Sequence, residues 1–491
     1  MEGVKRFDGA GSRAGGDPGA APQGRTGRVK KPRVRYPPPA LHVRPPARPP
    51  ASAPARRAAS LLLAALLSAC GPSDLDEVRF WAIGREGEVV QALLPEFERR
   101  HPGVRVRVQQ IPWSAAHEKL LTAFAGGALP DVFQLGNTWI PEFVALGALE
   151  ALDGRAAASA SLVREDFFPG VLATAEIEGL LYGVPWYVDT RLLFYRRDLL
   201  ARAGLDAPPR SWEEWLAALE RLRGAVAPGG HPLLVTLDEW QLPVILAMQR
   251  GAELLRDGGR FADFGAAPFR EAFAFHVALF ERGLAPPAGG AQAVHAHREF
   301  AEGRFAMWVT GPWNLGELRR RMPPELDAAW ATAPLPAPSV AAAPGLSLAG
   351  GAALALRRGS PRLEDAWRLV EFLAEPATQA AFHRLSGDLP ARRSAWSDPA
   401  LAGDPRVEAF RAQLAHVAPT PRIPEWERIA ARIVRAAEQV VRGEVDQAEA
   451  LAALDRDVDA LLEKRRWLLA RDERRRAAAG AGAAPLAGGA P

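Results

Sequence analysis

The sequence predicts an α/β fold in which a mainly parallel sheet is covered by helices. Two observations lead to this class. Patterns typical of strands and of helices alternate along the chain, and 48% of the 491 residues are hydrophobic, enough for sizeable buried cores. Strands that alternate with helices usually pair in parallel, because each helix carries the chain back to the edge where the previous strand began. The length also predicts two or three domains.

The alternation begins after residue 77. The elements expected in order are a strand over 78–83, a helix over 87–100, a strand over 104–108, a helix over 114–125 and a strand over 131–135. Strict alternation of apolar and polar residues predicts the second strand, and a period of 3.6 predicts the helices. Ligands of such sheets bind beyond the carboxyl ends of the strands, which lie here at 84–86 and 136–139.

Further helices are expected towards the C-terminus. Ser211 precedes Glu214 by three residues, a capping box that predicts a helix through about Leu222. Other helices are expected near 267–282, 361–374, 376–385, 424–442 and 447–465. The charged and then Ala- and Gly-rich stretch 471–491 is expected to have no regular structure.

Charge and cysteine content exclude several functions. The formal charge of +4 arises in the first 69 residues, which hold 13 basic and 3 acidic residues; the remainder holds 48 and 54, a net of −6. A nucleic-acid partner is therefore not expected. The single cysteine excludes a cysteine-based metal site, and the pair His295 and His297 is interpreted as a surface pair because side chains at i and i+2 diverge on a helix. We expect no metal and no cofactor.

An export signal is expected near the N-terminus. Arg56-Arg57 is followed by a dozen small or apolar residues that end at Cys70, the pattern of a signal peptide over 56–70. This apolar stretch is shorter than the roughly 20 residues that span a bilayer as a helix. A tether is expected over 71–77.

The residues before the signal have a separate interpretation. Signal peptides begin within about 15–30 residues of the cleavage site, so Met1 lies too far upstream. Residues 1–55 are therefore expected to be disordered or an over-extended gene start, with initiation at a codon such as that of Val29 or Val43.

Several blocks in the same order resemble the family 1 extracellular solute-binding proteins, of the maltose-binding-protein type. The blocks are Pro130-Asp131-Val132-Phe133 with Gly147-Ala148-Leu149, Tyr182 to Thr190 with Leu193-Phe194-Tyr195, and Phe300 to Met307 through Gly311-Pro312-Trp313. The resemblance covers about residues 76–465. Leu67-Ser68-Ala69-Cys70 likewise resembles a bacterial lipobox, which implies that Cys70 carries a lipid and becomes the mature N-terminus.

The resemblance implies a two-lobe periplasmic-binding-protein fold of the class II type that closes on its ligand. Lobe 1 would comprise 78–187 with 334–389, and lobe 2 would comprise 190–332 with 392–467. The chain would cross between lobes near 187–190, 333–336 and 387–392. It further implies a monomeric, non-enzymatic protein of the periplasm, anchored to a membrane through Cys70, that captures a mono- or oligosaccharide and delivers it to the permease of an ABC importer.

Candidate ligand-binding residues follow from the resemblance and from the chemistry of sugars. Sugars stack their C–H faces on aromatic rings and bond their hydroxyls to polar side chains. The candidates are Trp313, Trp426, Asp189, Tyr187, Glu239, Trp240, Asn137, Trp139, Glu86 and Trp113. Arg85-Glu86 stands where the maltose type has an acidic residue followed by a basic one, which argues against maltose itself.

Other residues in the same segments are interpreted as structural. Trp212, Trp215 and Trp367 occupy apolar helix positions and are expected in the core, and Arg392 is expected to be an exposed linker charge.

Three alternatives stay open from the sequence, and one of them is a signalling receptor subunit, which the sequence does not separate from a transport component. A lipid-anchored glycosidase would need two carboxylates about 5–10 Å apart, and no pair identifies itself. The same fold could also bind a non-sugar solute.

Overall fold

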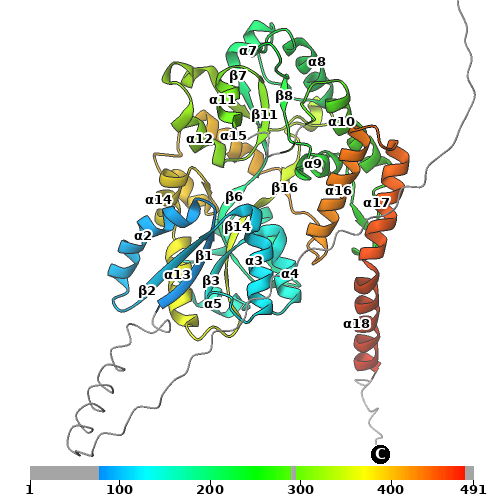
Figure 1. Cartoon of the computed structure of the whole chain (residues 1–491). Coiled ribbons are helices and arrows are strands. Elements are labelled where there is room, and N and C mark those ends of the chain that lie inside the picture. Colours follow the sequence, from blue (N-terminus) through cyan, green and yellow to red (C-terminus); the bar gives the residue numbers. More distant parts are fainter. Residues whose placement is uncertain (1–76, 288, 290–294, 482–491) are drawn as a thin grey trace, which may run out of the picture. The chain divides into compact units, whose positions relative to one another are not determined.

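The computed structural model describes residues 77–287, 289 and 295–481, with side chains up to Arg475 in the last helix (Figure 1). The contacts between residues group the chain into two units, with the boundary between Gly71 and Pro72. The second unit, which is compact, begins at Pro72. The expected signal peptide, Cys70 and most of the tether lie outside the described residues. In the part that is described, no helix is both long and apolar enough to cross a membrane.

The first sheet has six strands in the order β15-β6-β14-β3-β1-β2. The strands are β1 (Glu77–Ile83), β2 (Arg105–Ile111), β3 (Val132–Gly136), β6 (Val184–Asp189), β14 (Gly350–Leu356) and β15 (Leu389–Pro390). β1 pairs in parallel with β2 and β3, as the βαβαβ pattern predicts. β14 pairs antiparallel with β3 and β6, so the sheet is mixed. The reason is that β14 returns from the other sheet rather than following a covering helix.

Helices pack on this sheet and bury its apolar side chains. They are α2 (Glu86–Arg100), α3 (Trp113–Ala125), α4 (Ile140–Ala145), α5 (Asp153–Ala158), α6 (Pro169–Thr174), α13 (Leu363–Ala374) and α14 (Pro376–Ser386), with a small hairpin of β4 (Glu176–Ile177) and β5 (Leu180–Leu181). Phe97 of α2 meets Phe372 of α13 with ring centroids 5.5 Å apart. Elements far apart in sequence therefore share one core.

The second sheet has four strands in the order β12-β7-β11-β8. They are β7 (Leu192–Arg196), β8 (Leu233–Leu234), β11 (Met307–Thr310) and β12 (Trp330–Ala333). Its helices are α7 (Arg197–Arg202), α8 (Trp212–Leu222), α9 (Gln241–Gln249), α10 (Ala267–Glu281), α11 (Ala296–Ala301), α12 (Trp313–Arg321), α15 (Pro405–Leu414), α16 (Trp426–Val441), α17 (Gln447–Leu461) and α18 (Glu463–Ala481). Two small pairs complete it: β9 (Leu255–Arg256) with β10 (Phe261–Ala262), and β13 (Ser347–Leu348) with β16 (Val417–Ala418).

The chain passes from one sheet to the other at three places. β6 of the first sheet is followed after two residues by β7 of the second, β12 is followed by β14, and β15 is followed by α15, which packs on β12. The resemblance implies crossings near 187–190, 333–336 and 387–392. The passages observed here overlap each of these segments, and the second and third extend beyond them, to β14 and to α15. The fold is the α/β arrangement of two lobes joined by crossings (Figure 1).

Several local expectations are confirmed. α8 begins after Ser211, whose Oγ accepts a hydrogen bond from the Glu214 backbone N–H at 3.2 Å. Trp212, Trp215 and Trp367 are buried, as their helical positions predict.

Two other expectations are wrong. Residues 471–481 were expected without regular structure but continue α18, and the later residues lie outside the described part. The Ala- and Arg-rich composition that suggested disorder also has high helix propensity, and α18 is held at its start by the neighbouring hairpin.

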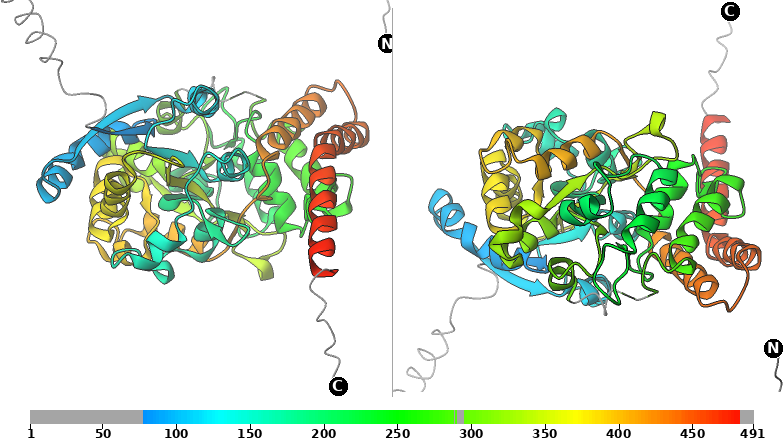
Figure 2. Two further views of the ribbon diagram at one scale, coloured as in Figure 1. Left: turned by 90° about the horizontal axis from the view of Figure 1, so that it is seen from below. Right: turned by 90° about the horizontal axis from the view of Figure 1, so that it is seen from above.

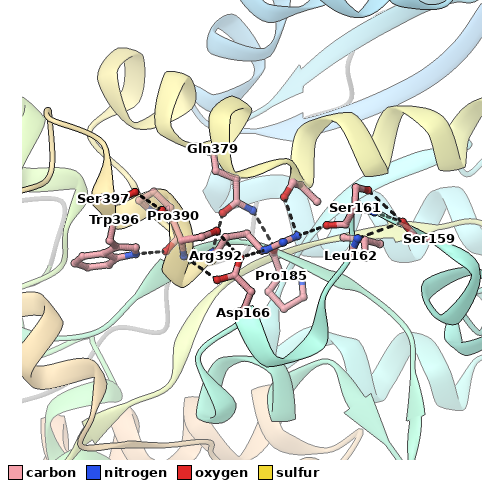
Figure 3. Close-up of polar contacts among 12 residues, drawn as sticks. Ser159, Ser161, Leu162, Asp166, Pro185, Gln379, Pro390, Arg392, Trp396 and Ser397 are labelled. Atoms are coloured by element: carbon pink, nitrogen blue, oxygen red, sulfur yellow. Dashed lines mark hydrogen bonds and ion pairs between the residues drawn. The ribbon is translucent and has the colours of Figure 1, made fainter.

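The second wrong expectation concerns Arg392, which was expected to be an exposed linker charge. The structure shows a buried residue with a structural role (Figure 3). Its side chain is 4% exposed, and its Nε donates to Asp166 Oδ2 at 2.7 Å. Its Nη1 donates to the Ser161 carbonyl at 2.8 Å, and its backbone N–H donates to Gln379 Oε1 at 2.9 Å. Hydrogen bonds hold the crossing after β15 against the first lobe. The sequence could not show this, since Asp166 lies 226 residues away.

Candidate functional site

A cleft lies where both lobes contribute residues. It consists of two cavities of about 450 Å³ and about 290 Å³. Five residues line both cavities, which makes them one continuous cleft: Trp113, Asp189, Arg191, Gln241 and Gly351. The first lobe lines it with residues that follow β1, β2 and β3, the edge at which ligands of α/β sheets bind.

Four tryptophans give the cleft apolar surfaces. Trp113 begins α3 and Trp139 follows β3, with their rings edge to face at a centroid distance of 5.8 Å. Trp240 precedes α9 and Trp313 begins α12, both in the second lobe. Trp113 is 43% exposed, which is unusual for so large an apolar side chain. Aromatic rings therefore line the cleft from both lobes.

Two glycines beside the cleft allow close contacts that a side chain at their positions would block. A Cβ on Gly311 would lie 1.8 Å from Cζ3 of Trp313, so only glycine lets this ring lie over the turn after β11. Gly351 has φ +131°, and a Cβ there would meet the Tyr187 carbonyl at 2.2 Å. Both glycines thus fix the shape of the larger cavity.

A buried acidic cluster forms one wall of the larger cavity. The Tyr187 hydroxyl donates to Glu86 Oε1 at 2.8 Å and accepts from Gln134 Nε2 at 2.8 Å. Burial raises the pKa of Glu86. Burial also raises the pKa of Asp388 to about 8, and the charge of Glu86 adds to that rise. At neutral pH Asp388 therefore keeps a proton that a free carboxyl group would have lost.

Arg191 lies at the centre of the cleft and lines both cavities. Its guanidinium is 4.7 Å from the ring centroid of Trp313, a cation–π contact. Its Nη1 is 3.8 Å from Asp189 Oδ1, and its Nη2 is 3.5 Å from Glu239 Oε2. Its backbone is fixed, because its N–H donates to Ser347 Oγ and its carbonyl accepts from the same hydroxyl. The side chain is 8% exposed, yet both carboxylates stand beyond good hydrogen-bond distance.

Polar atoms without partners concentrate in the smaller cavity. Six buried side-chain atoms of residues that line it have no hydrogen-bond partner within the described residues: Asn137 Nδ2 and Oδ1, Asp189 Oδ1, Thr190 Oγ1, Arg191 Nη1 and Gln241 Oε1. Buried polar atoms are nearly always satisfied in native proteins, since leaving one unpaired costs about 1–3 kcal/mol. These six include both donors and acceptors. They therefore suit a ligand that can itself donate and accept hydrogen bonds.

A hydrogen bond joins the lobes beside this cavity. Thr138 Oγ1, after β3, donates to Glu427 Oε1 in the first turn of α16 at 2.5 Å. Burial raises the pKa of Glu427. The two lobes are thus linked through residues that line the cleft.

The cleft collects eight of the ten sequence-predicted residues. Those that line it are Glu86, Trp113, Asn137, Trp139, Tyr187, Asp189, Trp240 and Trp313. Glu239 does not line either cavity but faces Arg191 from outside. Trp426 is 0% exposed and packs edge to face under Trp240, with centroids 5.3 Å apart. In this conformation Trp426 supports a cleft residue and cannot itself stack on a ligand.

The cleft also contains residues that the sequence did not predict, and among them Arg191, Gln241, Glu317, Asp388 and Glu427 are charged or carry an amide. Arg191 lies two residues after Asp189 in the first crossing, and Glu427 follows Trp426, so adjacency to predicted residues was the available signal. Asp388 could also have been considered, because it falls within an expected crossing. Gln241 and Glu317 carry no comparable signal.

Metal binding has no support in the described ranges. No group of three or more His, Cys, Asp or Glu side chains there is placed to hold a metal ion. His297 is half-buried rather than fully exposed, and its Nε2 hydrogen-bonds Asn314 Oδ1 at 2.6 Å. That contact makes it part of the packing of α11 on α12.

Two lobes, three crossings and a cleft with apolar and polar walls define the class of two-lobe binding proteins. The chain matches the family described as bacterial extracellular solute-binding protein over residues 81–380. It therefore belongs to this family, whose members are binding proteins rather than enzymes. The glycosidase alternative is set aside on this ground.

Three relatives show what the chain is similar to. The sugar-binding protein MalE of Xanthomonas citri is 44% identical, with a TM-score of 0.74 over 80% of this chain and 99% of that one. The galactooligosaccharide-binding protein of Bacillus subtilis is 25% identical over 78% of this chain and 91% of its own length. UgpB of Mycobacterium tuberculosis, solved in complex with glycerophosphocholine, is 25% identical, with a TM-score of 0.67 over 79% of this chain and 99% of that one.

Proposed function

We propose that this protein captures a carbohydrate between its two lobes and delivers it to the permease of an ABC importer. The observation that carries the proposal is the smaller cavity, which is lined by tryptophans and by residues that carry six buried polar atoms without hydrogen-bond partners among the described residues. A sugar offers both complements at once, since its hydroxyls donate and accept while its C–H faces stack on rings. The names of the Xanthomonas and Bacillus relatives support the same class of ligand.

Closure supports capture rather than simple surface binding. A ligand held between rings of both lobes contacts all of them only when the lobes approach, so binding favours the closed population. The Thr138–Glu427 hydrogen bond adds an interlobe contact beside the ligand position. The closed form is then the species that a permease would recognise.

The experiment is a thermal-shift screen of the purified chain against sugars of different length and linkage, followed by calorimetry on the strongest hit. A ligand at 100 times its Kd should raise the free energy of unfolding by about 2.7 kcal/mol. Absence of any shift from all sugars would refute the proposal.

Trp113→Ala tests whether the cleft is the binding site. Loss of this ring, which borders both cavities, should weaken sugar affinity by about 1–3 kcal/mol. The matched control is Trp467→Ala on α18, which removes a ring that is 57% exposed and lines neither cavity. Equal effects of the two substitutions would place the site elsewhere.

A lipid anchor is the second part of the proposal. Cys70 follows Leu67-Ser68-Ala69 after an apolar segment of signal-peptide length, which supports acylation of its sulfur after export. Mass analysis of the N-terminal peptide from a bacterial membrane fraction tests it. An acylated peptide that starts at Cys70 is expected, and a peptide from residues 5–25 in the mature protein would contradict it.

A non-sugar solute is kept as the second candidate because of Arg191. Its guanidinium has an Nη1 without a hydrogen-bond partner among the described residues, and guanidinium groups pair well with phosphate. The glycerophosphocholine complex of the Mycobacterium relative shows that a similar fold accepts such a solute. Glycerophosphodiesters therefore belong in the same screen.

A further inference from the structure

The last helix, α18, carries an exposed basic face around one tryptophan. Lys464, Trp467, Arg471 and Arg474 recur every three or four residues, so they lie along one side of the helix. Trp467 is 57% exposed, and the Arg471 guanidinium stacks on its ring at 5.1 Å. We call these four residues the basic face of α18.

The opposite side of α18 fixes the helix to the second lobe. Arg465 Nε donates to the Gly259 carbonyl at 3.1 Å, and Arg466 Nη1 donates to the Arg260 carbonyl at 3.0 Å. Arg466 also stacks on the ring of Phe261 at 4.9 Å. Arg260 in turn forms an ion pair with Glu473. Figures 1 and 2 show α18 (red) following the end of α17 at the edge of this lobe and projecting from it. The helix is therefore anchored through one side. On the other side Lys464, Trp467 and Arg474 are exposed, and Arg471 is partly exposed and lies 3.4 Å from Asp472 Oδ1.

The charge of the face is opposite to that of the remainder of the chain. Beyond residue 69 the chain has 48 basic and 54 acidic residues, a net charge of −6. A chain of that charge is repelled by an anionic surface unless a local basic region turns towards it. The basic face holds three of those positive charges in about three turns of helix, with Glu463 and Asp472 beside them.

The tryptophan decides which anionic surface fits. A folded acidic protein would need a pocket whose shape fits the ring of Trp467, which stands alone on the helix. A membrane interface accepts a single tryptophan among basic residues, because indole rings favour the headgroup level and Lys and Arg are drawn to anionic lipids.

We propose that the basic face of α18 docks on the surface of a membrane that contains anionic phospholipids. Trp467 enters the headgroup region, and Lys464, Arg471 and Arg474 lie over lipid phosphates. The contact is independent of the ligand in the cleft and of the proposed lipid on Cys70. Where that lipid is present, the face adds a second attachment, and a single chain with a basic patch holds a membrane more firmly than either alone.

The test measures binding of residues 72–491, the compact unit without the apolar signal segment, to lipid vesicles. Vesicles of phosphatidylglycerol mixed with phosphatidylcholine are compared with vesicles of phosphatidylcholine alone by co-sedimentation at low salt. Binding to the anionic vesicles only, lost at high salt, is expected. No binding to anionic vesicles, or equal binding to both kinds, would overturn the proposal.

Variants assign the binding to the face. Lys464→Gln with Arg471→Gln should weaken vesicle binding about 30-fold, since each basic side chain near an anionic surface contributes about a factor of five. The matched control is Arg428→Gln with Arg435→Gln, which removes two exposed charges from α16. A similar loss in the control would show that only overall charge acts.

Trp467→Phe separates insertion from attraction. Brominated lipid should quench part of the fluorescence of the unchanged chain, and this part should be missing in the variant. Identical quenching in the two proteins would contradict insertion of Trp467. All variants should keep the sugar-induced thermal shift, whereas Trp113→Ala should lose much of that shift and keep vesicle binding. The two proposals can thus fail separately.

Discussion

Two buried arginines beside crossings between the lobes differ in how well their charges are satisfied. Arg392 has a carboxylate at 2.7 Å and a carbonyl at 2.8 Å, and its guanidinium also lies 4.9 Å from the Phe167 ring centroid. Arg191 is nearly as buried, but its two carboxylates stand at 3.5 and 3.8 Å and its Nη1 has no hydrogen-bond partner in the described part of the chain.

The difference separates a structural charge from a binding charge. A buried charge with complete hydrogen bonds rigidifies its surroundings, and removing one partner exposes the full cost of burying the other. A buried charge with incomplete hydrogen bonds keeps its capacity for a ligand.

Arg392→Ala should lower the free energy of unfolding by about 3–5 kcal/mol, because Asp166 would lose its buried partner. Burial alone would raise the pKa of Asp166. Hydrogen bonds from Ser394 and Arg392 outweigh burial and hold this pKa below its usual value. Chemical denaturation measures the change, and the folded fraction should keep its sugar affinity. A loss under about 1 kcal/mol would show that the network in Figure 3 contributes little.

Arg191→Ala should weaken sugar affinity by about 1.5–3 kcal/mol, the size of a hydrogen bond to a charged group. Its effect on unfolding should be clearly smaller than that of Arg392→Ala, because fewer satisfied contacts are lost. Calorimetry and denaturation on the same samples compare the two. Equal destabilisation by both substitutions would remove the distinction between the arginines.

Trp313→Ala should weaken affinity by about 1–3 kcal/mol, as expected for an aromatic anchor in a cleft. Part of the loss would come from Arg191, whose guanidinium rests on this ring. A double-mutant cycle with Arg191→Ala measures that share. Unchanged affinity in a folded Trp313→Ala protein would make the ring purely structural.

Asp388→Asn should change how stability depends on pH. Burial raises the pKa of Asp388 to about 8, so between its ordinary value near 4 and pH 8 the folded state keeps a proton that the unfolded state has lost. The contribution of Asp388 to stability is then full at low pH and falls as pH rises to about 8. Asp388→Asn removes this pH-dependent loss of stability. The Tm of the variant minus the Tm of the unchanged protein should therefore be about 1–3 °C larger at pH 8 than at pH 5. Parallel Tm profiles would mean that Asp388 titrates normally.

The order of the elements, the family and most of the cleft residues could be predicted from local sequence patterns. The βαβαβ pattern placed Glu86, Trp113 and Asn137 after strands that share one edge, and parallel pairing brings such ends together whatever the details of packing. The capping residue Ser211 and the buried Trp215 also follow from local pattern, since hydrogen bonds within one turn and helical periodicity are properties of neighbouring residues.

Only the tertiary structure decided which polar residues are satisfied and which rings are open. Trp240 covers Trp426 although 186 positions separate them, and Asp166 pairs Arg392 from 226 residues away. Exposure and hydrogen-bond partners depend on contacts between distant segments, which no local pattern encodes. For this reason the sequence could identify Asp189 at a crossing but not Arg191 beside it, and it expected a solvent-exposed charge at Arg392 where the folded chain buries one.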